Sequence, residues 1–269
     1  MRIPISPNIR FQKPPIRPKY GLLNLFKENS INYIKNHSYK KKNIFSKNYN
    51  NRQITSSYYK EHLLNLANLI KKKFDTNISI CEIGCGDGDF LNILKKKGFK
   101  KLFGFDKVYK GNNKNIKKRY LNSNDKLEFD LIIFRHVLSV VENPFELINL
   151  VKKITFEDTY ILIDEDDFFW TEKNLAVWDL CYEQINYFNK KTFTNVFKKS
   201  FVKSMFFGQY FIFLSKLKYF DFDKKKDNWS KVNLSPYFKK FQSKINWINK
   251  KKYKRIYIWG TGKKGNMYL

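Results

Sequence analysis

The sequence has few of the features that disulfide-bonded, secreted or membrane-spanning proteins need. Its 269 residues include three cysteines, too few for a disulfide framework or a cysteine-rich zinc module. No segment approaches the roughly 20 consecutive apolar residues of a membrane span. The richest one, residues 200–217, is interrupted by lysines and by a Gly-Gln pair. The first 18 residues lack the apolar stretch of a signal peptide. We therefore expect a soluble protein of a reducing compartment, the cytoplasm.

Arginine is scarce, although the chain is strongly basic. Only 7 of the 53 basic residues are arginine, and with 24 acidic residues the formal net charge is +29. Arginine is the side chain that binds phosphates and base edges bidentately. The chain is also rich in Asn, Ile, Phe and Tyr, whose codons are rich in A and T, so biased coding explains the lysine excess at least as well as selection for binding. The charge therefore leaves nucleic-acid binding open without predicting it.

Apolar residues are plentiful, and their arrangement predicts the fold. The chain is 42% hydrophobic and 18% aromatic, enough for a buried core. Short apolar runs that predict strands (78–83, 102–105, 130–134 and 160–163) alternate with helical patterns (57–74, 89–97 and 144–153). Ser56 or Ser57 is placed to cap the first helix, Gly98 to end the second and Pro144 to begin the third. This alternation predicts an α/β fold, a Rossmann-like doubly wound, mostly parallel sheet with helices on both faces. Two aromatic runs, 201–207 and 210–214, predict a closing antiparallel hairpin.

The chain divides into four expected segments. Residues 1–55 are predicted to be a basic, extended or partly helical arm, and residues 56–219 the α/β domain. Residues 220–252 are predicted to be a basic, exposed linker. Residues 253–269 contain a strand pattern and a second glycine turn, and they predict the truncated start of another Rossmann-like unit.

A glycine-rich loop follows the first predicted strand. Glu82 precedes Gly84, Gly86 and Gly88 in a G-x-G-x-G pattern that opens a helix, and Asp106 ends the next strand. Glycines let the backbone pass close under a ligand, and ligands bind beyond the carboxyl ends of parallel strands. A carboxylate at the position of Asp106 can accept both ribose hydroxyls of a nucleoside.

Two ligands compete for such a loop, a dinucleotide and S-adenosylmethionine. The dinucleotide pattern is G-x-G-x-x-G, which brings a helix N-terminus to a pyrophosphate. Here the spacing is one residue shorter, and Glu82 would repel a pyrophosphate. The same carboxylate suits the cationic, phosphate-free methionine end of S-adenosylmethionine, which is therefore the favoured cofactor.

The segment from Glu82 to Gly88 resembles motif I of the class I S-adenosylmethionine-dependent methyltransferases, and residues 129–138 resemble their fourth strand and the following turn. The resemblance covers about residues 57–217. It implies that the cofactor is held by seven residues, namely Glu82, Gly84, Cys85, Gly86, Gly88, Asp106 and Arg135.

Two further segments resemble a narrower family, the nucleotide-sugar C-methyltransferases. Residues 182–188 are similar to its Tyr-Glu-His-containing segment, and residues 256–265 to the opening of its C-terminal Rossmann-like domain. The chain departs from that family in lacking the zinc module and most of the C-terminal domain. Ser139-Val140 stands where relatives have Glu-His, and Gln184 replaces a histidine associated with base chemistry.

The narrower resemblance implies methylation of a carbon beside the keto group of a nucleotide-linked deoxysugar. Such chemistry needs a base and a donor that stabilises the enolate oxygen. The candidate catalytic residues are His136, Tyr182 and Glu183, for each of which a structural role is an open alternative. The acidic run 164–167 has no matching ligands elsewhere, so we expect no metal and interpret the run as an exposed loop near the acceptor. His37 and His62 have no partner that the sequence identifies.

The favoured function is therefore that of an S-adenosylmethionine-dependent methyltransferase acting on a small molecule such as a keto-deoxysugar nucleotide. One alternative is a nucleic-acid methyltransferase that uses the basic arm, although Arg135-His136-Val137-Leu138 is not the Asn/Asp-Pro-Pro-Tyr acceptor signature of such enzymes. Another is a non-catalytic methyltransferase remnant. The sequence leaves the acceptor and the oligomeric state open.

Overall fold

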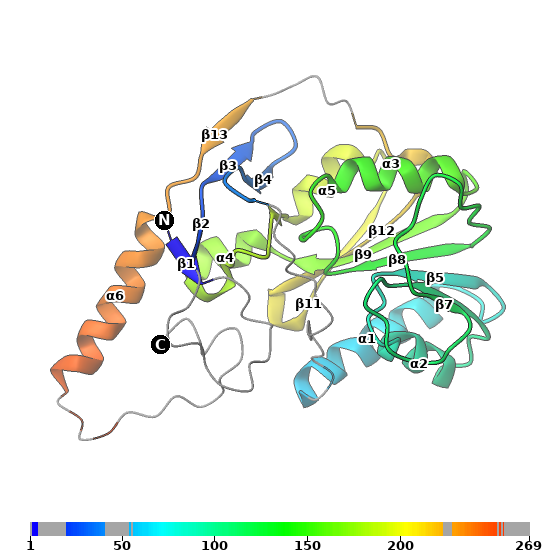
Figure 1. Cartoon of the computed structure of the whole chain (residues 1–269), viewed down its shortest axis with the longest axis horizontal. Helices are drawn as coiled ribbons and strands as arrows, with labels where there is room; N and C mark the ends of the chain where they lie inside the picture. The colour runs from blue at the N-terminus through cyan, green and yellow to red at the C-terminus, as the bar shows by residue number, and fades with distance from the viewer. Residues whose placement is uncertain are drawn as a thin grey trace.

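Figure 1 shows the computed structural model of the chain, which describes residues 2–4, 20–40, 54, 56–222, 228–251, 253 and 255. Its centre is a seven-stranded sheet in the order β11-β12-β9-β8-β5-β6-β7. The strands are β5 (Ser79–Ile83), β6 (Lys101–Phe105), β7 (Ile116–Lys117), β8 (Leu131–Arg135), β9 (Tyr160–Asp166), β11 (Phe201–Met205) and β12 (Tyr210–Lys216). Neighbours from β7 to β9 are parallel, and β12 pairs antiparallel with both β9 and β11. The predicted mostly parallel sheet and its closing hairpin are thereby confirmed.

The strand order reverses beside β5. From β5 the chain proceeds outward to β6 and β7, and then returns to place β8 on the other side of β5. Connections on the two sides of this point diverge beyond the carboxyl ends of the strands, which leaves a crevice between them. The glycine-rich loop leaves β5 at this crevice.

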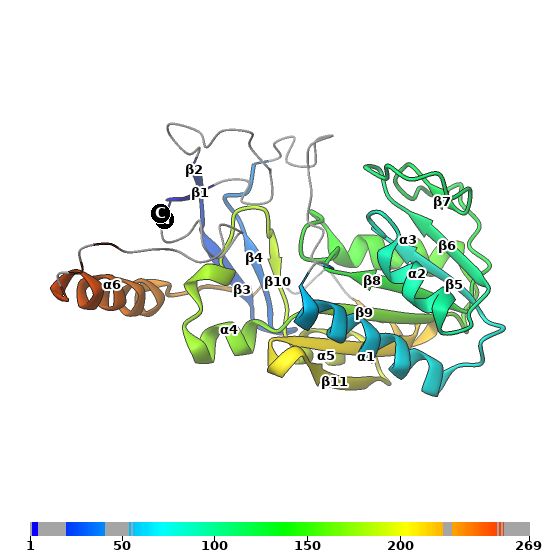
Figure 2. The same ribbon diagram turned by 90° about the horizontal axis from the view of Figure 1, so that it is seen from below.

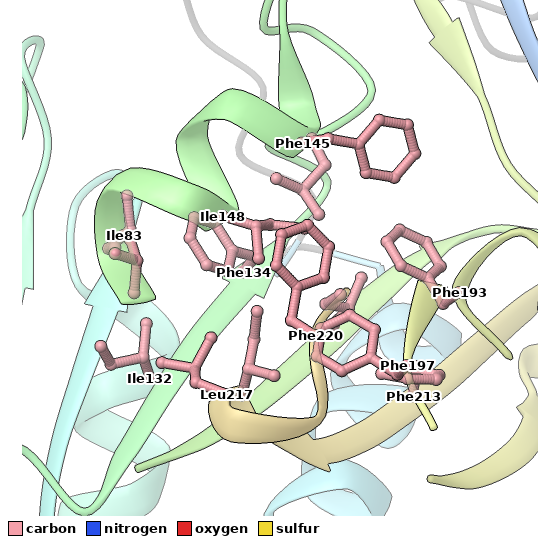
Figure 3. Packing of buried hydrophobic residues seen from close by; sticks show 14 of the residues in the cluster. Ile83, Ile132, Phe134, Phe145, Ile148, Phe193, Phe197, Phe213, Leu217 and Phe220 are labelled. Carbon is pink, nitrogen blue, oxygen red and sulfur yellow. The ribbon is translucent and has the colours of Figure 1, made fainter. Parts of the chain in front are cut away.

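Helices cover both faces of the sheet. In Figure 1, α3 (Pro144–Ile154) and α5 (Lys190–Val196) lie above the sheet, while α1 (Ser57–Lys73) and α2 (Asp89–Lys96) lie below it. Successive residues of β8 point to opposite faces of the sheet. Ile132 and Phe134 belong to the apolar cluster between the sheet and the helices α3 and α5, shown in Figure 3. Leu131 and Ile133 belong to the cluster between the sheet and the helices α1 and α2. A strand buried on both faces is a continuous apolar run, which explains why the sequence revealed it clearly.

The predicted helix ends agree with the structure. The side chain of Ser56 accepts a hydrogen bond from the Tyr59 amide and caps α1. Gly98 follows α2 with a φ of 105°, a conformation that glycine adopts without strain. Pro144 occupies the first turn of α3, where its missing N–H has no helical partner to lose.

Part of the expected arm is a β-hairpin. Strands β3 (Leu25–Glu28) and β4 (Tyr33–Asn36) pair with β10 (Asn186–Tyr187) and β13 (Trp229–Lys231) in a second sheet of order β10-β4-β3-β13. A further pair, β1 (Arg2–Pro4) and β2 (Tyr20–Leu22), is also antiparallel. The hairpin thus joins the α/β domain through β10, a long-range pairing that no local pattern encodes (Figure 2).

The expected linker contains a helix. This helix is α6 (Ser235–Lys250), and its Tyr237 is buried in an apolar cluster that includes Leu180. A shorter helix, α4 (Phe168–Asn174), directly follows β9. Short 3-10 turns occupy 177–179, 206–208 and 217–219. No helix in the described part of the chain has the length and apolarity to cross a bilayer. The predicted second glycine turn, residues 260–265, lies outside the described residues.

Asn186 connects the hairpin to the α/β domain, and its removal tests that connection. Its amide oxygen accepts from the Tyr33 hydroxyl at 2.5 Å, and its amide nitrogen donates to the carbonyls of Leu138 (2.8 Å) and Val141 (2.5 Å). Asn186→Ala leaves these groups without their partner, so we expect the free energy of unfolding to fall by about 2–4 kcal/mol in denaturant titrations. Asn92→Ala, at an exposed position of α2, is the control. Equal stability of the two variants would contradict this assignment.

Candidate active site

A cavity of about 710 Å³ opens at the carboxyl ends of β5, β6 and β8. Its wall includes residues 82–87 from the end of β5 and its glycine-rich loop, 105–108 at the end of β6, and 135–137 at the end of β8. The volume lies within the roughly 300–1,000 Å³ typical of small-molecule sites. The reversal of strand order therefore places a ligand-sized cavity at the position that the glycine pattern indicated.

Three glycines shape the loop after β5. Gly84, Gly86 and Gly88 all have positive φ, at 73°, 56° and 79°. A Cβ on Gly84 would lie 2.3 Å from Cγ2 of Val137, so the close approach of the loop after β8 also requires glycine there. A Cβ on Gly86 would meet no atom within 4 Å among the described residues. Gly86 therefore leaves a bare stretch of backbone beside open space, a cradle that a ligand can fill.

Asp106 fixes the loop and faces the same cavity. Its Oδ2 accepts a hydrogen bond from the Gly86 amide at 2.8 Å, and its Oδ1 accepts one from the Val108 amide at 2.8 Å. A carboxylate has about four acceptor positions, so both oxygens retain capacity for hydroxyl donors. The predicted glycine loop and the predicted ribose-binding acid are thus brought into direct contact.

Arg135 occupies the centre of a buried charge network. Its guanidinium donates to Glu82 at 3.0 Å, to the Tyr59 hydroxyl at 2.9 Å and to Asp164 at 3.4 Å. Asp164 is also 2.9 Å from Nε2 of His62, which supplies the partner that the sequence could not identify. The Arg135 side chain is 11% exposed and those of the two carboxylates at most 1%, so the charges interact with little solvent between them.

Burial and charge act in opposite directions on the two carboxylates. Burial raises the pKa of Glu82 to about 7, against the lowering effect of Arg135. Burial also opposes ionisation of Asp164, but His62, His136 and Arg135 together lower its pKa to about 2. Glu82 also retains a buried oxygen, Oε2, with no hydrogen bond within the described residues. A positively charged ligand group near Glu82 would therefore meet an acid with spare acceptor capacity.

The acidic run 164–167 is buried, so the prediction of an exposed loop is wrong. Its first three residues belong to β9, and Asp164 and Glu165 are at most 1% exposed. Glu165 accepts from the amides of Leu138 (2.8 Å) and Ser139 (3.3 Å), which anchors the turn after β8. Burial raises the pKa of Glu165 well above its ordinary value. Local sequence could not distinguish partnered carboxylates in a strand from solvated ones in a loop.

His136 is the predicted catalytic residue that lines the cavity. It follows β8 with a φ of 52°, an uncommon conformation for a residue with a Cβ, and its amide donates to the Asp164 carbonyl at 2.9 Å. Its Nε2 is buried without a hydrogen bond in the described part of the chain. Burial lowers the pKa of His136, so its imidazole is neutral at pH 7 and has a nitrogen that can accept a proton.

Tyr182 and Glu183 do not belong to the described lining of the cavity. Both are buried, and the Tyr182 ring packs 5.4 Å from that of Tyr39, which does line it. Gln184 is 3.5 Å from Asp166, also behind the wall. Of this segment, Ile185 reaches the cavity. The catalytic roles proposed for Tyr182 and Glu183 stay predictions.

Several lining residues had no signal in the sequence. Tyr59 projects from α1, Tyr39 follows the hairpin, and Lys107 and Lys110 follow Asp106. The tyrosines belong to a chain that is aromatic throughout, and the lysines to one that is basic throughout. Because these residue types are common throughout the chain, their positions gave no sign that they line a site.

The cavity fits a nucleoside that carries a cationic tail. Asp106 offers acceptors for ribose hydroxyls, Gly86 offers a bare backbone, and Glu82 offers an unengaged carboxylate oxygen. Cys85 lines the same wall, and burial strongly raises the pKa of its thiol, so the thiol packs rather than reacts. These features match S-adenosylmethionine better than a dinucleotide.

Glu82 predicts a specific pH dependence of stability. Because its pKa of about 7 in the folded chain exceeds the ordinary value of 4.5, the unfolded chain loses this proton first as the pH rises. Wild-type stability should therefore fall relative to Glu82→Gln between about pH 4.5 and 7, by about 2–3 kcal/mol, and then stay level. Denaturant unfolding of both proteins from pH 4.5 to 8 measures this difference. Parallel curves across that range would show that Glu82 is ionised throughout.

Comparison with known proteins agrees with this geometry. The sequence matches the model of one protein family, described as a methyltransferase domain, over residues 51–200, more than half of the chain. No curated protein matches the sequence.

Three solved structures are similar to the chain. One is the plantazolicin methyltransferase BpumL in complex with SAH, with 15% identity over 62% of this chain and 86% of that chain and a TM-score of 0.46. Another is magnesium protoporphyrin IX methyltransferase from Synechocystis with bound SAH, with 13% identity, coverage of 58% and 82%, and a TM-score of 0.41. The third is human N-acetylserotonin methyltransferase in complex with SAM, with 16% identity, coverage of 61% and 57%, and a TM-score of 0.41. By the family match, the chain belongs to the methyltransferase-domain family and is an S-adenosylmethionine-dependent methyltransferase of class I.

Proposed function

We propose that the chain transfers the methyl group of S-adenosylmethionine to a small-molecule acceptor, with His136 accepting the proton that the acceptor releases. One observation carries the proposal: a single cavity contains the glycine-rich loop with Asp106 and also His136. The strand order supports it, because β5 lies between β6 and β8. Asp106 and His136 therefore lie on opposite sides of the glycine-rich loop.

The chain's own residues bind and orient the cofactor. S-adenosylmethionine, when bound, supplies an electrophilic methyl group on a sulfonium. Asp106 would hold the ribose hydroxyls, and the glycines would let the backbone pass beneath the nucleoside. Glu82 would face the positively charged end, while Arg135 stabilises the buried Glu82 carboxylate. The role of these residues is mainly to position donor and acceptor, and such positioning can lower the barrier of a displacement by several kcal/mol, on the order of 7–11.

His136 is suited to take a proton because it is neutral, buried and aligned by the backbone. Its amide is hydrogen-bonded to β9, and its ring packs 4.8 Å from that of Tyr210. A neutral imidazole can act as a general base at pH 7. Because burial lowers its pKa, the imidazole is a weaker base, and it best supports proton transfer from a comparatively acidic acceptor such as a phenol or an activated carbon acid.

A finer hypothesis names a keto-deoxysugar nucleotide as the acceptor, in surface-polysaccharide or secondary-metabolite synthesis. Its support is the resemblance of residues 182–188, of which Ile185 contributes to the cavity. Gln184 cannot take a proton, so the base role in this hypothesis passes to His136. Exchange of solvent deuterium into the carbon beside the ketone tests it. Absence of exchange with such sugars, or exchange that persists in His136→Asn, would remove it.

The proposal is tested first at the cofactor. Asp106→Ala removes both the ribose acceptor and the carboxylate that holds the Gly86 amide, so we expect affinity for S-adenosylhomocysteine to fall by about 100-fold in calorimetric titrations. Asp221→Ala, an exposed aspartate paired with Lys198, should bind as the wild type does. Far-ultraviolet circular dichroism shows whether the variants are folded. A folded wild type that binds no S-adenosylhomocysteine at millimolar concentration would refute the proposed function and favour a non-catalytic remnant.

A further inference from the structure

The cavity has a second half whose character differs from that of the cofactor half. On the side of the loop after β8, its lining includes His136 and Glu142 and six apolar or aromatic residues, namely Tyr39, Val137, Val140, Val141, Leu147 and Ile185. We call these six residues the acceptor chamber. They come from three parts of the chain: the end of the N-terminal hairpin, residues 137–147 after β8, and the segment before β10. The chamber is therefore a product of the tertiary fold rather than of one motif.

Backbone hydrogen bonds connect the three parts at Ile185. Its amide donates to the Ser139 carbonyl at 2.8 Å, and its carbonyl accepts from the Asn36 amide at 2.8 Å. Ile185 thus lies between the turn after β8 and the end of β4. The adjacent Asn186 joins the same two parts through its side chain. These bonds give the chamber wall a defined position relative to His136.

Tyr39 is held in the wall by Tyr182. The Tyr182 hydroxyl accepts from the amide of Lys40 at 2.9 Å and lies 3.4 Å from its carbonyl. On another side, the Tyr182 ring packs against Gly21, where a Cβ would lie 2.1 Å from the ring. Tyr182 therefore contacts both β2 and the segment that follows β4. Through these contacts, a residue outside the described lining supports the position of Tyr39.

Among the residues that the structure describes, the six that form the chamber include no cation. The cations in the described lining are Lys107, Lys110, Arg119 and Arg135. The two lysines follow β6 beside Asp106, on the cofactor side. Arg119 is paired with Asp125, and Arg135 with Glu82. An acid of the described lining, Glu142, lies next to the chamber, and its backbone carbonyl accepts a hydrogen bond from Lys35 Nζ at 2.8 Å, outside the described lining. Among the described lining residues on this side, a diphosphate would meet the Glu142 carboxylate and no cation.

We propose that the acceptor chamber binds an uncharged apolar ring as the methyl acceptor, that Tyr39 determines this specificity by packing against the ring, and that Tyr182 is a positioning residue for Tyr39. The inference rests on the proposed function, because it names the acceptor class of the same site. Aromatic side chains pack against apolar rings with favourable geometry and large buried area. The hydroxyl of a phenolic ring would present its proton to His136.

Binding of 2-naphthol to the full-length chain, with S-adenosylhomocysteine present at saturation, tests the chamber. Calorimetry should show that Tyr39→Ala weakens 2-naphthol by about tenfold, since an aromatic contact of this kind is lost. Tyr39→Phe keeps the ring and should retain binding. Tyr58→Ala removes a tyrosine that is 64% exposed and outside the cavity lining, and it should bind as the wild type does. Tyr182→Phe should weaken 2-naphthol several-fold and leave S-adenosylhomocysteine unaffected.

The outcomes separate the two levels of the proposal. Loss of 2-naphthol in Tyr39→Ala with unchanged S-adenosylhomocysteine affinity supports the chamber. A wild type that binds S-adenosylhomocysteine but not 2-naphthol at millimolar concentration overturns it, as does tighter binding of thymidine diphosphate 4-keto-6-deoxyglucose. If Tyr182→Phe lowers the affinity for 2-naphthol and for S-adenosylhomocysteine equally, Tyr182 supports the fold in general and is not a positioning residue for Tyr39. A wild type that binds no S-adenosylhomocysteine refutes the underlying function instead.

Discussion

The ion pairing of Arg135 is the interaction on which the rest of the site depends. Arg135 ends β8 and contacts Glu82 at the end of β5, Asp164 on β9 and Tyr59 on α1. One guanidinium therefore contacts side chains from two neighbouring strands and a helix, beside the point where the strand order reverses. Two buried carboxylates would be costly without this counter-charge, because removing one partner leaves an uncompensated charge in a medium of low polarity. These contacts fix the ends of β5 and β8 and the start of α1 relative to one another, within the two apolar clusters that cover the faces of the sheet.

A second constraint acts at the turn after β8. Glu165 holds the amides of Leu138 and Ser139, while Asn186 holds the carbonyls of Leu138 and Val141. The turn therefore has its donors and acceptors satisfied from two different directions, by a strand of the main sheet and by a strand of the hairpin sheet. This is the environment in which His136 can maintain a positive φ, since a strained backbone persists where its surroundings over-determine it. Gly84 contributes by letting Val137 approach the cofactor loop.

The sequence predicts the features that depend on residues close together in the chain, and it does not predict those that depend on contacts between distant residues. Glu82, the three glycines and Asp106 were predictable because a strand, a loop and a helix in succession fix their geometry, and the structure places Asp106 directly on Gly86. The run 164–167 was misread because its carboxylates find partners as distant as His62, which no window of sequence can reveal. Residues 20–40 read as an arm because a hairpin paired with residues 186–187 has no periodic signal of its own. Tyr39 gave no signal because the chain is aromatic throughout.

The cavity has a charged part and a mostly apolar part, and neither depends on the many lysines of the chain. The charges that the site requires are paired and buried at Glu82, Arg135 and Asp164, and none is a lysine. The lysines of the described lining follow Asp106, whereas the described wall beyond His136 is aliphatic and aromatic apart from Glu142. An electrophilic sulfonium reacts best where water is excluded and the acceptor is oriented, and an apolar wall accomplishes both. The net charge of +29 is therefore a poor guide to the site, where the paired charges of Glu82 and Arg135 lie on one side of the described lining and mostly apolar side chains lie beside His136.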